Sequence, residues 1–298
     1  MPLPENLILK KRKRTANCRR RPVAYLGTMI FNLVTSWRKT LRHLTAATIV
    51  LLTVGTMLQA QTRGSAGDAG ILEPTFVIDK PTAGMLKRAD YNVSANFYQR
   101  GGVLTAVNVG LFDRFSFGIS YGGTGIIGPD KIEMNPLPGV RAKLRLIQET
   151  AMTPAVAIGF DSQGKEPYLD ADSLKRYTIK SPGFYAVASK NYALLGHLSL
   201  HGGFNYSLEN KDGDKDMNLY VAAEKSLGDI LSILAEYDFA VNDNNERIGR
   251  GRGYLNIGFR LSAGEGLMIG FDLKNVTQNQ KNIKIANRVL QIEYVGSF

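Results

Sequence analysis

Three basic residues alternate along one short stretch of the chain, at Arg141, Lys143 and Arg145. In an extended strand these side chains point to the same side, because successive side chains of a strand face opposite ways. Like charges so close together must be compensated by water or by carboxylates. The row can therefore attract anionic solutes into a pore, or it can pair with acidic residues across a filled interior.

Acidic partners for the second interpretation lie on the polar side of other alternating stretches, at Glu224, Glu236, Asp238 and Asp272. Arg260 shares that polar side. We predict that an interior passage carries the charges that set selectivity. The candidate residues are Arg141, Lys143, Arg145, Glu236, Asp238, Arg260 and Asp272.

A second chemical candidate is the pair His197 and Ser199, followed by His201. A His and a Ser two residues apart on a strand resemble the pair in outer-membrane phospholipase, a twelve-stranded barrel in which they face lipid. In this chain Leu198 and Leu200 occupy the apolar side, which turns His197 and Ser199 to the polar side, and no matching Asn is identified. We interpret these residues as polar lining, and we predict no catalytic residue, no metal site and no cofactor.

Three carboxylates alternate at Asp212, Asp214 and Asp216 in the segment NKDGDKDMN. Calcium loops use alternating carboxylates, but they also need a Glu at the twelfth position, which this segment lacks. We interpret it as a solvated surface loop.

The basic residues of the chain are concentrated near its start. The formal net charge is +11, and eleven of the 37 Lys and Arg residues lie in residues 1–60 beside a single acidic residue, Glu5. The rest of the chain is almost neutral, with 26 basic and 25 acidic residues, so nucleic acid is not an expected partner. The only cysteine, Cys18, lies in the same basic region, which excludes thiol chemistry and disulfides in the remainder.

The start of the chain has the pattern of a secretory leader. A basic region precedes an apolar run from Leu44 to Leu58, which is shorter than the roughly 20 residues of a spanning helix. We predict a signal peptide over residues 1–60, with Met29 as an alternative start, and a periplasmic entry segment over residues 61–90. An N-terminal membrane anchor is the alternative for the apolar run.

From Tyr91 onward the chain alternates between apolar and polar residues with a period of two, which predicts strands. Most candidate strands are near the 9 to 11 residues that a tilted membrane strand needs. The twelve candidates are residues 91–98, 102–112, 114–121, 139–148, 154–162, 182–190, 193–207, 217–226, 229–240, 252–262, 266–275 and 287–298.

The apolar sides of these strands carry no charged residue in our assignment, as in the series Phe115, Phe117, Ile119 and Tyr121. A charge facing lipid near the midplane costs about 2 to 4 kcal/mol, so its absence favours exposure to a bilayer. The connections alternate between short turns, such as Asn191 with Tyr192, and long loops, such as residues 122–138. This segregation favours an all-β, antiparallel transmembrane barrel of about 12 strands over residues 91–298, rather than a soluble sandwich.

The last eleven residues, RVLQIEYVGSF, alternate up to the final aromatic residue. Leu290, Ile292, Tyr294 and Phe298 share one side, and this pattern resembles the C-terminal strand of bacterial outer-membrane β-barrels. The resemblance implies that the barrel-assembly machinery reads this strand, and that it then closes the barrel against the first strand.

Three segments are also loosely similar to YjbH-type barrels, which are associated with exopolysaccharide export: NPLPGVRAKLRL, PAVAIGFDSQG and KSPGFYAVASKNY. We predict a protein of the bacterial outer membrane, surrounded by outer-membrane lipid, that acts as a porin-like channel or binding barrel for small polar solutes. The alternatives are a non-conducting surface barrel whose loops bind a partner or polysaccharide and, less favoured, a lipid enzyme.

Overall fold

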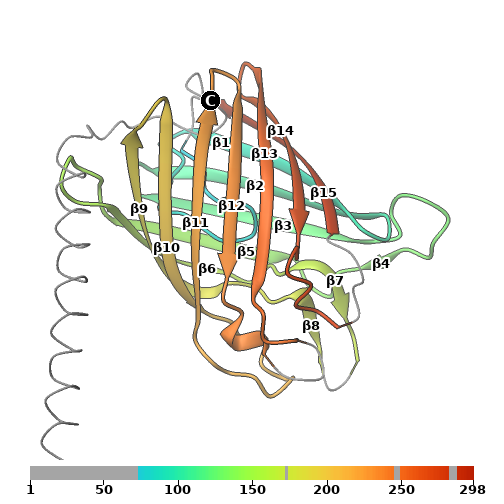
Figure 1. Cartoon of the computed structure of the whole chain (residues 1–298). Helices are drawn as coiled ribbons and strands as arrows, with labels where there is room; N and C mark the ends of the chain where they lie inside the picture. Colours follow the sequence, from blue (N-terminus) through green and yellow to red (C-terminus); the bar gives the residue numbers. More distant parts are fainter. Residues whose placement is uncertain (1–72, 172–173, 245–248, 282–286) are drawn as a thin grey trace, which may run out of the picture. The chain divides into compact units, whose positions relative to one another are not determined.

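In a computed structural model, the chain forms a closed antiparallel β-barrel (Figure 1). The structure describes residues 73–171, 174–244, 249–281 and 287–298, so the predicted signal peptide lies outside the described residues. Within these ranges, no helix is both long and apolar enough to cross a membrane.

Twelve long strands make the wall, and each pairs with its neighbours in antiparallel fashion. They are β1 (Asp90–Tyr98), β2 (Gly102–Phe112), β3 (Phe115–Thr124), β5 (Gly139–Ile147), β6 (Ala155–Asp161), β9 (Gly183–Ala193), β10 (His197–Tyr206), β11 (Asn218–Leu227), β12 (Leu231–Asp238), β13 (Tyr254–Gly264), β14 (Leu267–Lys274) and β15 (Asn287–Ser297). The predicted fold class and all twelve predicted strands are confirmed.

The last strand closes the barrel against the first. β1 and β15 pair from Asp90 opposite Ser297 to Phe97 opposite Leu290. Closure leaves no unpaired sheet edge along this seam, which is a requirement for a sheet surrounded by lipid.

Several predicted strand boundaries are shifted, and the largest shift lies between β9 and β10. Asn191 and Tyr192 were expected to form a turn, but both belong to β9, and the turn to β10 falls at residues 194–196. Leu195 and Gly196 adopt positive φ angles there, so the backbone reverses three residues later than the apolar pattern suggested.

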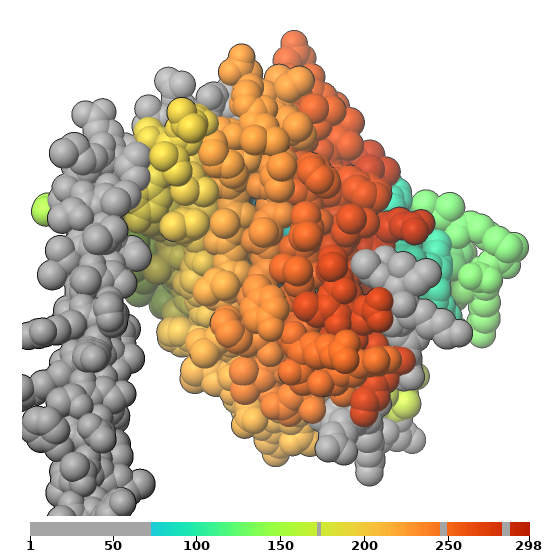
Figure 2. Space-filling model, viewed as in Figure 1, coloured from blue at the N-terminus to red at the C-terminus, as the bar shows by residue number. Residues whose placement is uncertain are grey.

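The outer surface of the wall is an apolar belt, and Figure 2 shows the strands from β10 to β14 as a continuous surface. Large apolar side chains stay exposed along it because their strand parity turns them away from the lumen. They include Val107, Phe117, Ile119, Val140, Leu144, Ile158, Leu200, Phe204, Val221, Phe259, Ile269, Phe271, Leu290 and Ile292.

Charged residues with outward parity lie near strand ends. Lys190 donates to the carbonyl oxygen of Ala151 at 3.1 Å, and Lys225 donates to that of Leu195 at 2.7 Å. Arg288 lies at the second position of β15. These positions allow a long side chain to reach the polar edge of a bilayer.

The two rims differ as the sequence predicted. Short connections lie on the rim where β1 begins and β15 ends, which we call the short-turn rim. The opposite, long-loop rim carries most of the long connections, and two of them contain strands that we did not predict (Figure 1). These are β4 (Glu133–Met134), which pairs with β3, and the hairpin of β7 (Lys165–Leu169) with β8 (Arg176–Ile179).

A charge placed on the belt should destabilise the barrel. Leu200 lies mid-strand in β10 and is 44% exposed. We expect Leu200→Arg to lower the free energy of unfolding from lipid vesicles by about 2 to 4 kcal/mol, because the guanidinium would face hydrocarbon. Urea titration measures this change. Leu200→Met is the matched control and should stay within about 1.5 kcal/mol of the wild type. Equal stability of the Arg and Met variants would contradict a lipid-facing belt.

Candidate functional site

A segment that precedes the first strand folds back into the lumen. Residues 73–86, which we call the plug hairpin, include a buried run from Val77 to Leu86. Its two arms are held by hydrogen bonds from the Val77 amide to the Lys80 carbonyl (3.0 Å) and from the Thr82 amide to the Thr75 carbonyl (3.1 Å). A side chain at Gly84 would collide with the carbonyl of Pro74, so glycine lets the two arms approach.

The tip of the plug hairpin wraps around one carboxylate of the wall. Three consecutive backbone amides donate to Glu236 of β12: Ile78 at 3.1 Å, Asp79 at 3.0 Å and Lys80 at 2.8 Å. Glu236 is almost fully buried. Convergent backbone N–H groups form a concave anion site, and here they compensate a buried carboxylate.

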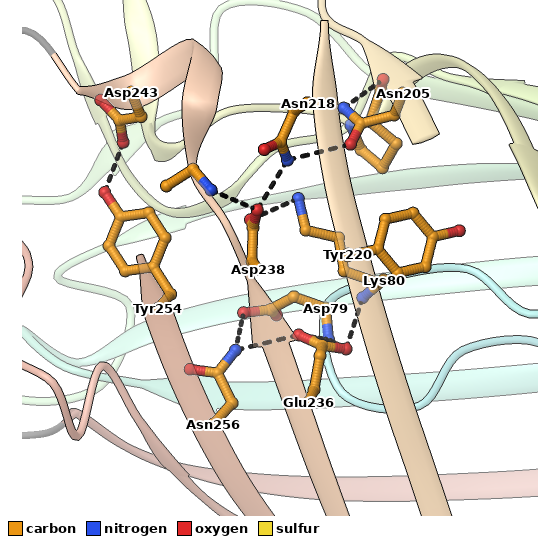
Figure 3. Close-up of polar contacts among 12 residues, drawn as sticks. Asp79, Lys80, Asn205, Asn218, Tyr220, Glu236, Asp238, Asp243, Tyr254 and Asn256 are labelled. Atoms are coloured by element: carbon orange, nitrogen blue, oxygen red, sulfur yellow. Dashed lines mark hydrogen bonds and ion pairs between the residues drawn. The ribbon is translucent and has the colours of Figure 1, made fainter. Parts of the chain in front are cut away.

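The two charged side chains at the tip also have wall partners (Figure 3). Lys80 pairs with Asp238 at 2.6 Å, and Asp79 pairs with Lys274 at 2.6 Å. Asn256 donates to both Asp79 (3.4 Å) and Glu236 (2.9 Å). The positive charge of Lys80 therefore faces a negative wall residue, and the negative charge of Asp79 faces a positive one.

The basic row points inward as predicted, but its partners differ from the expected acidic residues. Arg141 pairs with Asp161 of the neighbouring strand at 2.9 Å. Lys143 donates to three plug carbonyls, those of Thr75 (2.8 Å), Thr82 (3.0 Å) and Gly84 (3.1 Å). The sequence could not reveal this arrangement, because the partners are main-chain atoms of a distant segment.

Arg145 completes the contact between the basic row and the plug hairpin. Its guanidinium donates to the Ala83 carbonyl at 3.0 and 2.7 Å and pairs with Glu73. The amide of Ala83 in turn donates to Ser189 of β9 at 2.8 Å. This plug residue therefore has both its backbone amide and its carbonyl bound by wall side chains.

Arg260 and Asp272 form an ion pair at 2.7 Å on neighbouring strands. Arg260 also donates to the Val77 carbonyl at 2.9 Å, and Tyr220 donates to the Pro81 carbonyl at 2.8 Å. All seven predicted charged residues thus lie on the inner side of the wall, and five of them form hydrogen bonds or ion pairs with the plug hairpin. Those five are Lys143, Arg145, Glu236, Asp238 and Arg260.

Little open volume remains in the lumen. A cavity beside Phe76 and Glu293 holds about 40 Å³, one beside Arg145 and His201 about 20 Å³, and one beside Asp79 about 10 Å³. A water molecule needs roughly 10 to 15 Å³ on this measure, so these cavities have room for a few waters only. Among the residues that the structure describes, these cavities between plug and wall are thus too small for a solute larger than water.

His197 and Ser199 face the lumen, as their parity predicted, and both are buried. The Ser199 hydroxyl lies 2.8 Å from Nε2 of His197 and donates to Oδ1 of Asn191 at 2.6 Å. Sequence reasoning missed Asn191 because it was assigned to a turn. Since Asn191 receives the hydroxyl proton of Ser199, this group is arranged as an interior hydrogen-bond network rather than as a nucleophile with its base.

A second set of contacts covers the lumen at the long-loop rim. Arg176 of β8 is fully buried and pairs with Asp212 (2.6 Å) and Asp243 (2.8 Å), which belong to two other loops. Tyr254 at the start of β13 donates to Asp243 (Figure 3). Asp212 also pairs with Lys180 at 2.8 Å. The interpretation of Asp212 as a solvated residue is wrong, since it links loops in a buried ion pair.

Fold and surface together define the class of protein. A closed barrel of twelve antiparallel strands, with an apolar belt outside and a charged interior, is a transmembrane β-barrel of the outer-membrane type. Its special feature is a lumen that the chain itself fills.

The sequence matches no protein-family model and no curated protein. Among solved structures, the chain is similar to a KdgM porin, with 7% identity over 70% of this chain and 99% of the porin and a TM-score of 0.42. A KdgM porin in complex with disordered oligogalacturonate gives 8% identity, the same coverage and a TM-score of 0.43. The translocator domain of the autotransporter NalP from Neisseria meningitidis gives 13% identity over 70% of this chain and 87% of that domain, with a TM-score of 0.33.

Removing the carboxylate at the tip should loosen the plug hairpin. In Glu236→Ala the amides of Ile78, Asp79 and Lys80 lose their acceptor, and each buried unsatisfied group costs about 1 to 3 kcal/mol. We expect amide hydrogen exchange of residues 77–82 to accelerate at least about tenfold, while the barrel strands away from β12 keep their protection. Glu133→Ala, at an exposed position of the short strand β4, is the control. Unchanged exchange in the Glu236 variant would show that the tip is held by other contacts.

The long-loop rim should be sensitive to pH through Glu209. Burial raises the pKa of this carboxyl from 4.5 to about 7, although the Ser181 amide donates to it at 3.0 Å and Arg176 lies nearby. Between these pKa values the folded protein binds a proton that the unfolded chain has released, so the free energy of unfolding falls as pH rises from about 4.5 to about 7. We expect Glu209→Gln to flatten this dependence and to be more stable than the wild type at pH 8.

Urea unfolding from vesicles between pH 4.5 and pH 8 measures this effect. Glu133→Gln, at an exposed position of the short strand β4, should keep the pH dependence of the wild type. If Glu209→Gln showed the same slope as the wild type, the pKa of Glu209 would not be the cause of the dependence.

Proposed function

We propose that this protein is an outer-membrane, porin-like barrel for small polar solutes whose lumen is closed at rest by the plug hairpin. The observation that carries the proposal is the polarity of the wall behind the plug. Lys143 and Arg145 lie on one part of the wall and Glu236 with Asp238 on another, and all four depend on plug atoms for compensation. If the plug left, water and polar solutes would take over these contacts.

The way the plug is attached supports a closed but reversible state. Residues 87–89 connect it to β1, and its contacts to the charged residues of the wall are hydrogen bonds and ion pairs. Such groups are solvated again when they separate in water, so each contributes a modest net free energy, about 1.5 to 3 kcal/mol for a hydrogen bond to a charged group. Separation of plug and wall in a hydrated lumen therefore costs far less than separation in an apolar core.

The C-terminal strand fits a role in assembly. Leu290, Ile292 and Tyr294 face outward on β15, and Phe298 stacks on Tyr91 of β1 at 4.9 Å between ring centroids. We propose that the barrel-assembly machinery recognises these residues before the seam closes, and that outer-membrane lipid then covers the belt. The signal peptide over residues 1–60 would direct the chain to that machinery.

The second candidate is a non-conducting surface barrel whose long loops bind a partner or polysaccharide. Two observations favour it: the filled lumen, and the buried ion pairs of Arg176 that fix three loops in one arrangement. Under this alternative the plug hairpin serves only to stabilise the interior. Conductance separates the two candidates.

The decisive variant replaces residues 73–86 with a Gly/Ser linker of equal length and leaves every wall residue in place. In planar bilayers we expect discrete conductance steps from this linker variant and no conductance from the wild type, because only the variant has a water-filled lumen.

Within the linker variant, the double substitution Lys143→Gln and Arg145→Gln should reduce the preference for anions. A Gly/Ser replacement of the exposed loop residues 129–132 is the control and should stay closed. A folded linker variant without conductance would instead support the non-conducting barrel.

A further inference from the structure

The wall recognises the plug hairpin mainly through its backbone. Glu236 binds three amides, Lys143 binds three carbonyls, and Arg145 binds the Ala83 carbonyl. Arg260, Tyr220 and Ser189 add one main-chain contact each. Every peptide carries these N–H and C=O groups, so most of this recognition does not depend on the plug's particular side chains.

The side-chain contacts add a second, less general layer of recognition. Asp238 binds the ammonium of Lys80, and Lys274 binds the carboxylate of Asp79. The guanidinium of Arg141 lies 4.2 Å from the ring centroid of Phe76, at cation–π distance. The wall thus offers complementary partners for a basic, an acidic and an aromatic side chain of a peptide.

From these contacts we infer that the luminal wall is a binding site for short peptides, and that the plug hairpin is its tethered occupant. The inference rests on the proposed function, since a free peptide can enter only when the plug leaves. Three N–H donors converging on Glu236 distinguish this chemistry from that of a sugar, whose hydroxyls both donate and accept. An anionic oligosaccharide would satisfy Lys143 and Arg145 but would add negative charge to a lumen that already carries Glu236 and Asp238.

The test uses the full chain with the Gly/Ser linker in place of residues 73–86. The probe is a synthetic peptide with the sequence of residues 73–86, EPTFVIDKPTAGML, acetylated and amidated at its ends. Isothermal titration calorimetry in detergent measures binding, and single-channel recording measures block of the current. We expect binding and block in the linker variant, and no binding to the wild type, whose site is occupied.

Two substitutions in the linker variant locate the site. Glu236→Gln should weaken peptide binding at least about tenfold, because it removes the charge that the three amides contact. Glu293→Gln is the control: Glu293 is a half-buried luminal carboxylate, but its partners are Asn92 and Gln291 of the wall. The linker variant with Glu293→Gln should bind the peptide with the same affinity as the linker variant without it. Equal loss in both substitutions would contradict a site centred on Glu236.

Other probes define the ligand class. A peptide of the same composition in scrambled order should bind the linker variant more weakly than the plug sequence but still measurably, since the backbone contacts persist. Maltohexaose and a heparin-derived hexasaccharide should bind less tightly than either peptide. Tighter binding of the heparin hexasaccharide than of the plug peptide would overturn the inference in favour of anionic saccharides.

The outcomes also separate this inference from the proposed function. A linker variant that conducts but shows no binding or block by the plug peptide keeps the channel and overturns the peptide site. A variant that binds the peptide but does not conduct keeps the site and overturns the channel. A folded variant, verified by circular dichroism and heat modifiability, that does neither overturns both.

Discussion

The interior of this barrel depends on one constraint: a charged group that is removed from water needs an ion-pair or hydrogen-bond partner. Glu236 illustrates it most directly, because its carboxylate lies almost fully buried inside the wall and receives three backbone amides from the plug tip. With the plug in place, water is excluded from Glu236, and the three amides take over its solvation. A plug seated elsewhere in the lumen would leave those three amides without this acceptor. The position of the plug hairpin therefore follows from the charge pattern of the wall.

The barrel could be predicted from the sequence because a membrane strand is a local signal. Each strand separates lipid from an aqueous or polar interior, so residues such as Leu200 and His201 must alternate in type, and a period of two can be read from the residues themselves. The boundary error at Asn191 arose where that contrast weakens near a strand end. The inward direction of Arg141, Lys143 and Arg145 followed from the same parity.

The plug hairpin could not be predicted, because its contacts join residues far apart in sequence and lack periodicity. Lys143 binds Thr75 and Thr82, and Arg260 binds Val77 across almost the whole chain. Every residue type has a main-chain carbonyl, so the sequence of a segment does not show that its carbonyls bind distant side chains. Residues 61–90 were predicted only to form a periplasmic entry segment. Asp212 was misjudged for a related reason, since its partner Arg176 lies in a different loop.

The balance between apolar and polar contacts bears on whether the plug can move. Val77 and Ile78 pack against Ala222 and Leu234, and Ala83 packs in a second small cluster with Tyr220. These clusters are limited in size and lie among charged groups that water can solvate equally well once the lumen is hydrated. A continuous apolar interface would hold a permanent plug more stably, because buried ion pairs contribute little net stability. The charged attachment of this plug is therefore better explained by specific and reversible closure than by stability alone.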